Sequence, residues 1–288
     1  MKTKLPAIIR IYFMLIPAAF LSLAGCDKTE PPYKENNPTG TPSGSLRKIL
    51  LEDYTGHKCG NCPRAGAKAQ SLKNTYGEQL VVISVHAGGY ANPTPSGTTM
   101  EYDFRTQPGT DLDVFFDISL SAGNPNGMIN RIGYPFSHIK SDAAWSSVVD
   151  SLAAIPASAE IALFNTNAGG TYNISAKAKF LQAFSGTYKL ALYVTEDSIV
   201  KPQVDYSLLP SNDTIYNYLH RHVLRDAVNG TWGDTIATGS ITPGVEYSKN
   251  YVYTPALLWN TAHCAFVAFV YDAATYEVLQ AEEQRLAQ

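Results

Sequence analysis

Two cysteines separated by two residues, Cys59 and Cys62, constrain this sequence more than any other feature. They follow a strand-like run that begins at residue 51 and a turn, and they open a helical pattern. At a helix start the backbone N–H groups and the macrodipole stabilise a thiolate, so we expect Cys59 to ionise near neutral pH. Cys62 lies one turn further on the same face, where it can resolve a mixed disulfide formed by Cys59. This layout is typical of a thiol–disulfide redox site.

The first 26 residues form a pattern typical of a bacterial lipoprotein signal. A basic start precedes a mostly apolar run over residues 11–25, and Leu-Ala-Gly-Cys closes this run at Cys26. The run is too short for a membrane span, which needs about 20 apolar residues. The sequence therefore predicts a signal peptide over residues 1–25 and a lipid on Cys26 that anchors the chain to a membrane. An ordinary signal peptide with an incidental cysteine is the alternative.

The segment after this signal has nothing to bury. Residues 27–45 contain one aromatic and no aliphatic side chain, so residues 26–45 are predicted to be a lipidated cysteine and a disordered tether. The remaining chain is long enough for one large or two ordinary domains. Its formal charge of −3 and its pI of about 6.1 offer no polyanion-binding surface, so nucleic acid is not an expected partner.

Residues 46–156 are predicted to form an α/β domain. A strand over residues 47–54, a helical pattern and a strand over residues 80–86 that is apolar on both faces follow one another. A strand, a helix and a parallel strand make a right-handed crossover, which brings the C-terminal ends of both strands to one rim. Cys59 and His86 are expected to meet there.

The rest of this predicted domain contains a loop and two helices. Residues 88–109, rich in Gly, Pro and Thr, are expected to be an inserted loop near the rim, and residues 111–116 a short helix. A second helix, with an apolar stripe from Trp145 to Leu152, is expected to be capped by Ser141 or Asp142.

Residues 157–288 are predicted to be an all-β domain. Alternating apolar and polar residues separated by turn signals predict a β-sandwich of the immunoglobulin type. The seven expected strands cover residues 160–164, 172–181, 188–195, 216–224, 245–253, 264–271 and 276–282.

The cysteine motif and its surroundings resemble the thioredoxin family. Asp53 lies six residues before Cys59, and Pro125 precedes a strand at the place where that family has its cis-proline. The resemblance implies a thioredoxin-like domain in which Cys59 is the nucleophile and Cys62 the resolving cysteine. It also implies that Asp53 moves a proton to and from Cys62 and that Pro125 shapes the substrate groove.

The sequence departs from the thioredoxin pattern around the first cysteine. Lys58 replaces the usual aromatic residue, and Asn61 replaces the usual residue before the second cysteine. Lys58 is expected to depress the pKa of Cys59 further, and His57 and His86 are further candidates for tuning this thiolate. The direction of electron flow stays open.

The chain as a whole resembles the Omp-type outer-membrane lipoprotein family of Bacteroidetes. The resemblance rests on the lipobox, on Thr-Gly-x-x-Cys-x-Asn-Cys-Pro, on Pro-Asn-Gly-Met-Ile-Asn-Arg over residues 125–131, and on the late segments 222–225 and 229–233. It implies a thioredoxin-like domain followed by a β-sandwich. It also implies an outer-membrane, lipid-anchored protein that faces the periplasm or the cell surface.

Two functions from different classes are compatible with these features. The first is a membrane-anchored thiol–disulfide oxidoreductase with a protein thiol or disulfide as partner. The second is a surface binding module or adhesin in which the cysteine pair is a structural disulfide. No Gly-rich phosphate loop and no nucleophile-elbow serine is present in the sequence, and no cofactor is expected.

Three further features have less specific interpretations. Zinc held by His57, Cys59, Cys62 and His86 is a third option, but a single Cys-x-x-Cys is weak support and no metal is expected. His220 and His222 alternate on a predicted strand with Tyr218 and are interpreted as sandwich surface. Cys264 lies in an apolar alternating run and is interpreted as a small buried hydrophobic residue.

Overall fold

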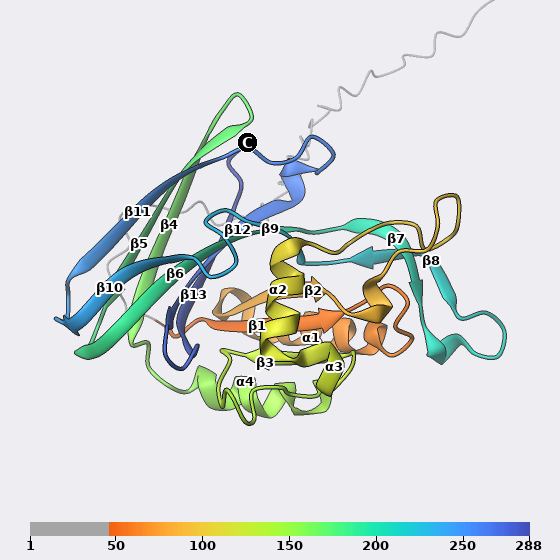
Figure 1. Cartoon of the computed structure of the whole chain (residues 1–288), viewed down its shortest axis with the longest axis horizontal. Helices are drawn as coiled ribbons and strands as arrows, with labels where there is room; N and C mark the ends of the chain where they lie inside the picture. The colour runs from red at the N-terminus through yellow and green to blue at the C-terminus, as the bar shows by residue number, and fades with distance from the viewer. Residues whose placement is uncertain (1–45) are drawn as a thin grey trace, which may run out of the picture. The chain divides into compact units, whose positions relative to one another are not determined.

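A mixed sheet of eight strands dominates the computed structural model, which describes residues 46–288 (Figure 1). In spatial order its strands are β13 (Val278–Arg285), β12 (Cys264–Asp272), β6 (Phe184–Glu196), β9 (Val223–Ala227), β2 (Leu80–His86), β1 (Ile49–Thr55) and β3 (Asn126–Ile129), and β10 (Asp234–Ile241) also pairs with β6. The predicted signal peptide, Cys26 and the predicted tether lie outside the described residues.

Two smaller sheets and four α-helices complete the fold. The three-stranded sheet has the order β11 (Glu246–Tyr253), β5 (Thr171–Phe180) and β4 (Ala159–Ala168), and β7 (Ile199–Val204) pairs only with β8 (Thr214–His220). The helices are α1 (Cys62–Tyr76), α2 (Gln107–Phe116), α3 (Ile118–Ser121) and α4 (Trp145–Ala153). None of the helices within residues 46–288 is long and apolar enough to cross a membrane.

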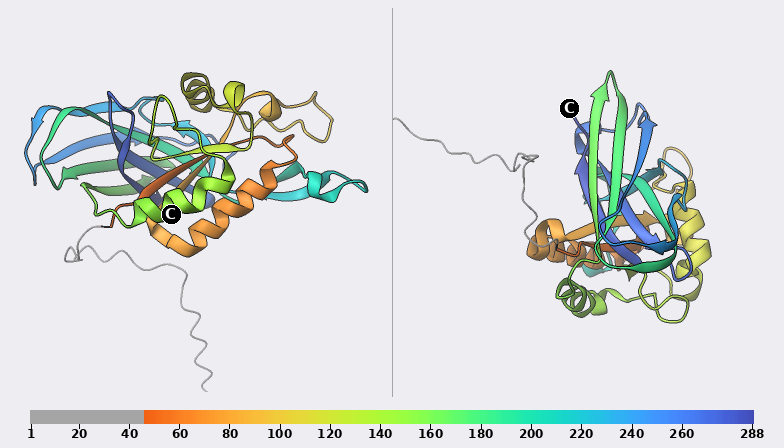
Figure 2. Two further views of the ribbon diagram at one scale, coloured as in Figure 1. Left: turned by 90° about the horizontal axis from the view of Figure 1, so that it is seen from below. Right: turned by 90° about the vertical axis from the view of Figure 1, so that its left-hand side faces the viewer.

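The helices cover both faces of the β2–β1–β3 part of the large sheet (Figure 2). On one face α1 and α4 pack over Leu51 and Val82, and on the other face α2 and α3 pack over Leu50 and Val81. Strands β1 and β2 are parallel and almost wholly buried, which explains why apolar residues occupy both faces at the start of each strand. The three-stranded sheet encloses a separate core against β6, β10 and β12.

Helix α1 follows from local sequence rules. Pro63 stands in its first turn, where the missing N–H costs nothing, and Gly77 ends it with a φ of 55°, which glycine adopts without strain. Its predicted stripe of Ala65, Ala69 and Leu72 is buried, as expected from the 3.6-residue period.

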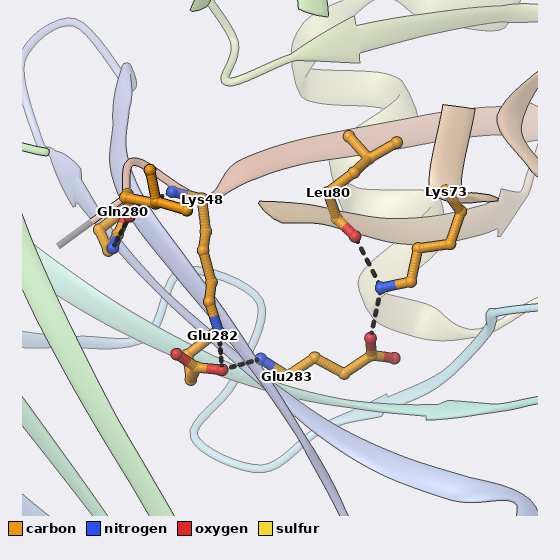
Figure 3. A network of polar contacts seen from close by, with 7 residues as sticks. Lys48, Lys73, Leu80, Gln280, Glu282 and Glu283 are labelled. Carbon is orange, nitrogen blue, oxygen red and sulfur yellow. Dashed lines mark hydrogen bonds and ion pairs between the residues drawn. The ribbon is translucent and has the colours of Figure 1, made fainter. Parts of the chain in front are cut away.

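Polar contacts join this α/β part to β13 (Figure 3). The backbone N–H of Lys48 donates to Oε1 of Gln280 at 2.7 Å, and the Lys48 ammonium pairs with Glu282. From α1, the ammonium of Lys73 donates to Oε2 of Glu283 at 2.9 Å and to the carbonyl of Leu80 at 2.6 Å.

The predicted mixture of α/β and β-rich structure is confirmed, but several element boundaries are wrong. The helix expected at residues 111–116 begins at Gln107, and neither Ser141 nor Asp142 caps α4, because a 3₁₀ turn over Asp142–Ala144 precedes it. Ten strands follow residue 157 instead of seven. Strands β7 and β10 were not expected, and the strand expected over residues 216–224 is broken at His222, whose φ is 52°.

Strand β9 links the two predicted regions. It pairs antiparallel with β6 and parallel with β2, where Ser84 faces Val223. The N–H of Ser84 donates to the carbonyl of His222 at 2.8 Å. The large sheet therefore contains strands from both residues 46–156 and residues 157–288.

Candidate functional site

The two predicted redox cysteines form a disulfide between β1 and α1. Their Cα atoms lie 5.4 Å apart, Cys62 is the first residue of α1, and Cys59 lies in the preceding turn. The N–H of Cys59 donates to the carbonyl of Gly56 at 3.0 Å, and the N–H of Cys62 donates to the carbonyl of Cys59 at 3.2 Å. Only 2% of Cys59 and 3% of Cys62 is exposed, so the closed disulfide is shielded from solvent.

Asp53 and Cys62 line the same cavity, which has a volume of about 270 Å³. Asp53 is buried, and its Oδ1 has no hydrogen-bond partner among the described residues. Loss of hydration on burial, together with the negative charge of Asp142, raises the pKa of Asp53 to about 7. This carboxyl group therefore changes its protonation state near neutral pH beside the Cys62 side of the disulfide.

Three buried histidines surround Phe104 on this side of the sheet. The ring of His86 stacks on Phe104 with centroids 4.4 Å apart, and the ring of His220 lies 4.4 Å from the same residue. His57 is tilted against Phe104 at 5.6 Å, and its Nε2 lies 3.2 Å from the carbonyl of Met100. Phe104 and Met100 belong to the loop that was predicted to lie near this rim.

Burial keeps these imidazoles neutral. It lowers the pKa of His57, lowers that of His86 well below its usual range, and lowers that of His220 to about 4. Both ring nitrogens of His86 and Nε2 of His220 have no hydrogen-bond partner among residues 46–288. His86 and His220 line the cavity that Asp53 and Cys62 share.

The β7–β8 hairpin covers the disulfide loop. The N–H of Val204 donates to the carbonyl of His57 at 2.9 Å, and the N–H of Tyr206 donates to the carbonyl of Gly60 at 2.9 Å. The Gln203 amide donates to the carbonyls of Gly56 and Cys59 at 3.2 and 3.0 Å. A Cβ atom on Gly60 would lie 2.3 Å from the Tyr206 ring, so this ring packs directly on the glycine between the cysteines.

Pro125 lies beside the C-terminal end of β1, on its β3 side. The Asn124–Pro125 bond is cis, and Asn126 pairs with Tyr54 of β1, which places Pro125 next to the C-terminal end of that strand. The Asn124 amide donates to the carbonyl of Thr55, the last residue of β1, at 3.0 Å and to that of Ala87, directly after β2, at 3.1 Å. Lys58 is partly exposed and, together with Asn124, lines a groove of about 450 Å³.

The structure corrects one interpretation of the histidines. His220 was expected on a sandwich surface, but its side chain is buried against Phe104 because the loop over residues 92–106 covers that face of β8. No group of three or more His, Cys, Asp or Glu side chains within residues 46–288 is arranged to hold a metal ion. Cys264 is buried, as expected.

Sequence reasoning missed the hairpin residues that touch the site. Gln203 and Tyr206 are more than 140 residues away from Cys59 along the chain, and neither belongs to a recognisable motif. The alternation of Tyr218 and His220 was a usable signal for a strand, but it did not reveal which element covers it.

Comparisons with known proteins agree with the fold. The family model described as outer membrane protein Omp28 matches residues 114–288, which is more than half of the chain and begins after the cysteine pair. HBP35 of Porphyromonas gingivalis has a similar structure, with a TM-score of 0.61, 20% identity, and coverage of 84% of this chain and 76% of that one. An Agrobacterium tumefaciens protein has a TM-score of 0.50 at 14% identity, covering 85% and 96%.

A solved domain of the outer membrane lipoprotein Omp28 from Porphyromonas gingivalis is 21% identical, covers 46% of this chain and 89% of its own length, and has a TM-score of 0.30. No curated protein matches the sequence. Because the family model covers more than half of its residues, the chain belongs to the Omp28 outer membrane protein family.

Proposed function

We propose that this chain is a lipid-anchored thiol–disulfide exchange protein of the outer membrane, with Cys59 as the nucleophile and Cys62 as the resolving cysteine. The family assignment indicates an outer membrane protein. The observation that carries the redox proposal is Asp53, a buried carboxyl group with a pKa of about 7 that shares a cavity with Cys62. An acid tuned to neutral pH beside one sulfur of a disulfide supports proton transfer to and from that sulfur.

The exchange step balances without a cofactor. In the reduced protein the Cys59 thiolate attacks a partner disulfide, so a Cys59–partner bond forms and one partner sulfur leaves as a thiolate. Asp53 takes the proton from the Cys62 thiol, and the Cys62 thiolate then attacks Cys59. The Cys59–Cys62 bond forms and the second partner sulfur leaves. The partner gains two electrons and the cysteine pair loses two; the reverse direction uses the same steps backwards.

The groups around Cys59 differ in what they contribute to this thiolate. His57 and His86 are kept neutral by burial, so they supply no positive charge near pH 7. Lys58, next to Cys59 and partly exposed, remains as the cationic neighbour in the sequence. Of the three tuning residues, Lys58 is therefore the one proposed to favour a thiolate at Cys59 in the reduced protein.

The proposed fold assignment is a thioredoxin-like domain over residues 46–156 and an immunoglobulin-like sandwich over residues 157–288. The order β1, α1, β2 with the cysteine pair between β1 and α1, and Pro125 before the antiparallel strand β3, support the first part. The packing of the β11–β5–β4 sheet against β6 and β12 supports the second part. In this assignment Pro125 shapes one wall of the partner groove.

The proposed anchor is a lipid on Cys26, which would place the exchange site at the periplasmic or outer face of the membrane. Metabolic labelling with a fatty acid tests this directly. Label is expected on the full chain and not on a Cys26→Ala variant, whereas label on both would refute the assignment.

The reduction potential of the Cys59–Cys62 pair tests the redox proposal. The full chain is equilibrated in thiol redox buffers, and the fraction reduced is read as a mass shift after alkylation, with Cys59→Ser as the control that cannot form the pair. A value between about −120 and −270 mV is expected for an exchange catalyst, and a value below about −300 mV would identify a structural disulfide.

The burial of both cysteines favours a second candidate function, a surface binding module held together by this disulfide. Cys59 and Cys62 are almost inaccessible beneath the β7–β8 hairpin, as expected for a structural bond. This candidate predicts that binding of cells or matrix by the full chain survives replacement of both cysteines. Loss of binding in a variant that still folds would count against it.

A further inference from the structure

The β7–β8 hairpin is bound to the disulfide loop mainly through the loop's main chain. Four loop carbonyls, those of residues 56, 57, 59 and 60, accept hydrogen bonds from three residues of the hairpin, Gln203, Val204 and Tyr206. Two of these donors, the N–H groups of Val204 and Tyr206, are two residues apart. Alternate N–H groups of an extended chain point to the same edge, so an extended segment runs along the loop.

This hairpin is held by few other elements. It forms its own two-stranded sheet and has no strand pairing with the large sheet. An isolated two-stranded ribbon is only marginally stable, so its position depends on the contacts it makes with the disulfide loop and with the loop over residues 92–106, and on the packing of His220 against His86 and of Tyr218 against Gly66. In that second contact, Lys201 lies over the ring of Tyr102 at 4.7 Å, and His220 packs on Phe104.

A thiol cannot reach the disulfide while the hairpin is in place. Exchange requires a thiolate to approach one of the sulfurs, and Cys59 and Cys62 are only 2% and 3% exposed. When the hairpin leaves, the carbonyls of His57 and Gly60 lose their N–H donors. A partner that supplies N–H donors from an extended segment replaces these bonds, whereas a small thiol leaves the carbonyls to water, so such a partner opens the site more easily.

We infer that the β7–β8 hairpin occupies, in cis, the docking site of the partner, and that this partner is an extended polypeptide segment that replaces residues 203–206 along the disulfide loop. The inference rests on the proposed exchange function. Because two of the four bonds to be replaced come from backbone N–H groups, any extended chain can make those two, as in the addition of a strand to an exposed edge. The Tyr206 ring on Gly60 indicates that the replacing segment carries a large flat side chain at this position.

This site lies on the opposite side of the disulfide loop from Pro125. The hairpin contacts the loop on the side of the cavity shared by Asp53, Cys62 and His86, whereas Pro125 adjoins β3. The partner segment therefore approaches the cysteine pair from the side of β2. Displacement of the hairpin exposes the disulfide, whose Cys62 sulfur is the one that exchanges a proton with Asp53.

The experiment measures how fast the Cys59–Cys62 bond is opened in the full chain by two reductants. One is dithiothreitol, a small dithiol that offers no backbone donors, and the other is reduced, unfolded ribonuclease, a polypeptide thiol. Tyr206→Ser removes the ring from Gly60, and Gln203→Ala independently removes the amide contacts. Leu209→Ser is the matched control, because this side chain lies at the tip of the same hairpin and is 56% exposed.

We expect Tyr206→Ser and Gln203→Ala to raise the rate with dithiothreitol about tenfold or more, because the rate of reaction of a gated group follows the population of its open state. Leu209→Ser is expected to leave it within about twofold. With the unfolded polypeptide as reductant, the ratio of the variant rate to the parent rate is expected to be clearly smaller, since this reductant displaces the hairpin of the parent protein by itself.

Three results would overturn the inference. Unchanged rates in both hairpin variants would show that the hairpin is no gate, and so would a disulfide that stays closed in every variant. An equal gain with both reductants would show a gate that is not a docking site. The rate ratios do not depend on the equilibrium potential, so a potential typical of a structural disulfide would refute the proposed function separately.

Discussion

Glu52 and Asp53 are neighbours on β1, and both carboxyl groups are buried, but their surroundings are opposite. Successive residues of a strand point to opposite faces of a sheet, so the two side chains enter different cores. Glu52 makes two hydrogen bonds with the buried Arg131, at 2.8 and 2.7 Å. Asp53 faces the cavity beside Cys62, and its Oδ1 has no partner among the described residues.

The comparison shows that burial alone does not identify a functional carboxylate. The Arg131 guanidinium lies 5.0 Å from the ring centroids of Phe116 and Phe269, so both members of the pair are enclosed and mutually satisfied. That pair joins β1 to the turn after β3. The carboxyl group without a cation beside it keeps a pKa of about 7, and it lies where a thiol must gain or lose a proton.

The largest expected effect comes from breaking the buried pair. Arg131→Met leaves Glu52 as a buried charge without a partner, and such a loss costs about 3–5 kcal/mol of unfolding free energy. Urea unfolding of the full chain at pH 7 measures it. The double variant Glu52→Leu/Arg131→Met is expected to recover most of the loss, and both variants should retain the parent reduction potential. A stable Arg131→Met protein would show that the pair does not support the fold.

Asp53→Asn is expected to change the free energy of unfolding by a similar amount, but this change depends strongly on pH. Burial raises the pKa of Asp53 from about 3.8 in the unfolded chain to about 7 in the folded one. Between these values the folded state keeps a proton that the unfolded state has lost, so stability falls as pH rises, and the loss is complete above about pH 7. The variant lacks this loss, so it should gain roughly 4 kcal/mol relative to the parent between pH 4 and pH 8.

Urea unfolding at several pH values tests this, with the exposed Glu78→Gln as the matched control, for which no such pH-dependent gain is expected. Exchange should also slow in Asp53→Asn, since the amide cannot take the proton from Cys62. A parent and variant with parallel pH profiles would show that Asp53 is ionised in the folded state, and the contrast with Glu52 would disappear.

The Asp53 face of β1 could be predicted from sequence to a large extent. The β1, α1 and β2 patterns are local, with mostly apolar runs in the strands and a 3.6-residue stripe in the helix, so the position of Cys62 beside the end of β1 followed from them. The cavity itself could not be predicted, because His220 reaches it from β8, far along the chain.

The cover over the disulfide was missed for physical reasons. Strand β7 contains Pro202, which cannot donate to a strand ladder and weakens the strand signal, and its pairing with β8 is irregular between Lys201 and Gln203.

Strand β10 contains Gly239 and few large apolar residues, so it has no clear alternation. Arg131 was present in a recognised motif, but its partner Glu52 is determined by the pairing of distant strands.

His220 adds a second buried titratable group to the Asp53 face, with the opposite pH dependence. Burial lowers its folded pKa to about 4, whereas the unfolded chain binds the proton below about pH 6.5. Stability contributed by the neutral ring is therefore present above pH 6.5 and is lost as pH falls to about 4, by roughly 3 kcal/mol in total. In a variant without His220, the fall in stability with rising pH that Asp53 causes should therefore be easier to see.

His220→Gln is expected to lose less stability than the parent protein when the pH falls from 7 to 4. Urea unfolding at the two pH values measures the difference, and the partly exposed His263→Gln serves as the control. An unchanged acid sensitivity in His220→Gln would mean that the ring is protonated in the folded protein. The Asp53 face would then contain a cation, and the proposed contrast between a paired and an unpaired carboxylate would be weaker.

The smallest expected effect is that of the disulfide itself. The Cys59–Cys62 bond closes a loop with a sequence separation of three, and chain entropy for so short a loop gives about 2 kcal/mol of stabilisation. The variant Cys59→Ala/Cys62→Ala should lose about this much in urea unfolding, less than Arg131→Met, with the reduced parent protein as the control. A loss as large as that of the buried ion pair would make the disulfide a second structural support, and it would favour the binding-module function over exchange. A loss near 2 kcal/mol would mean that the buried pair of Glu52 contributes more to stability than the disulfide does. Of the two neighbouring carboxyl groups on β1, Glu52 would then serve stability and Asp53 the exchange chemistry.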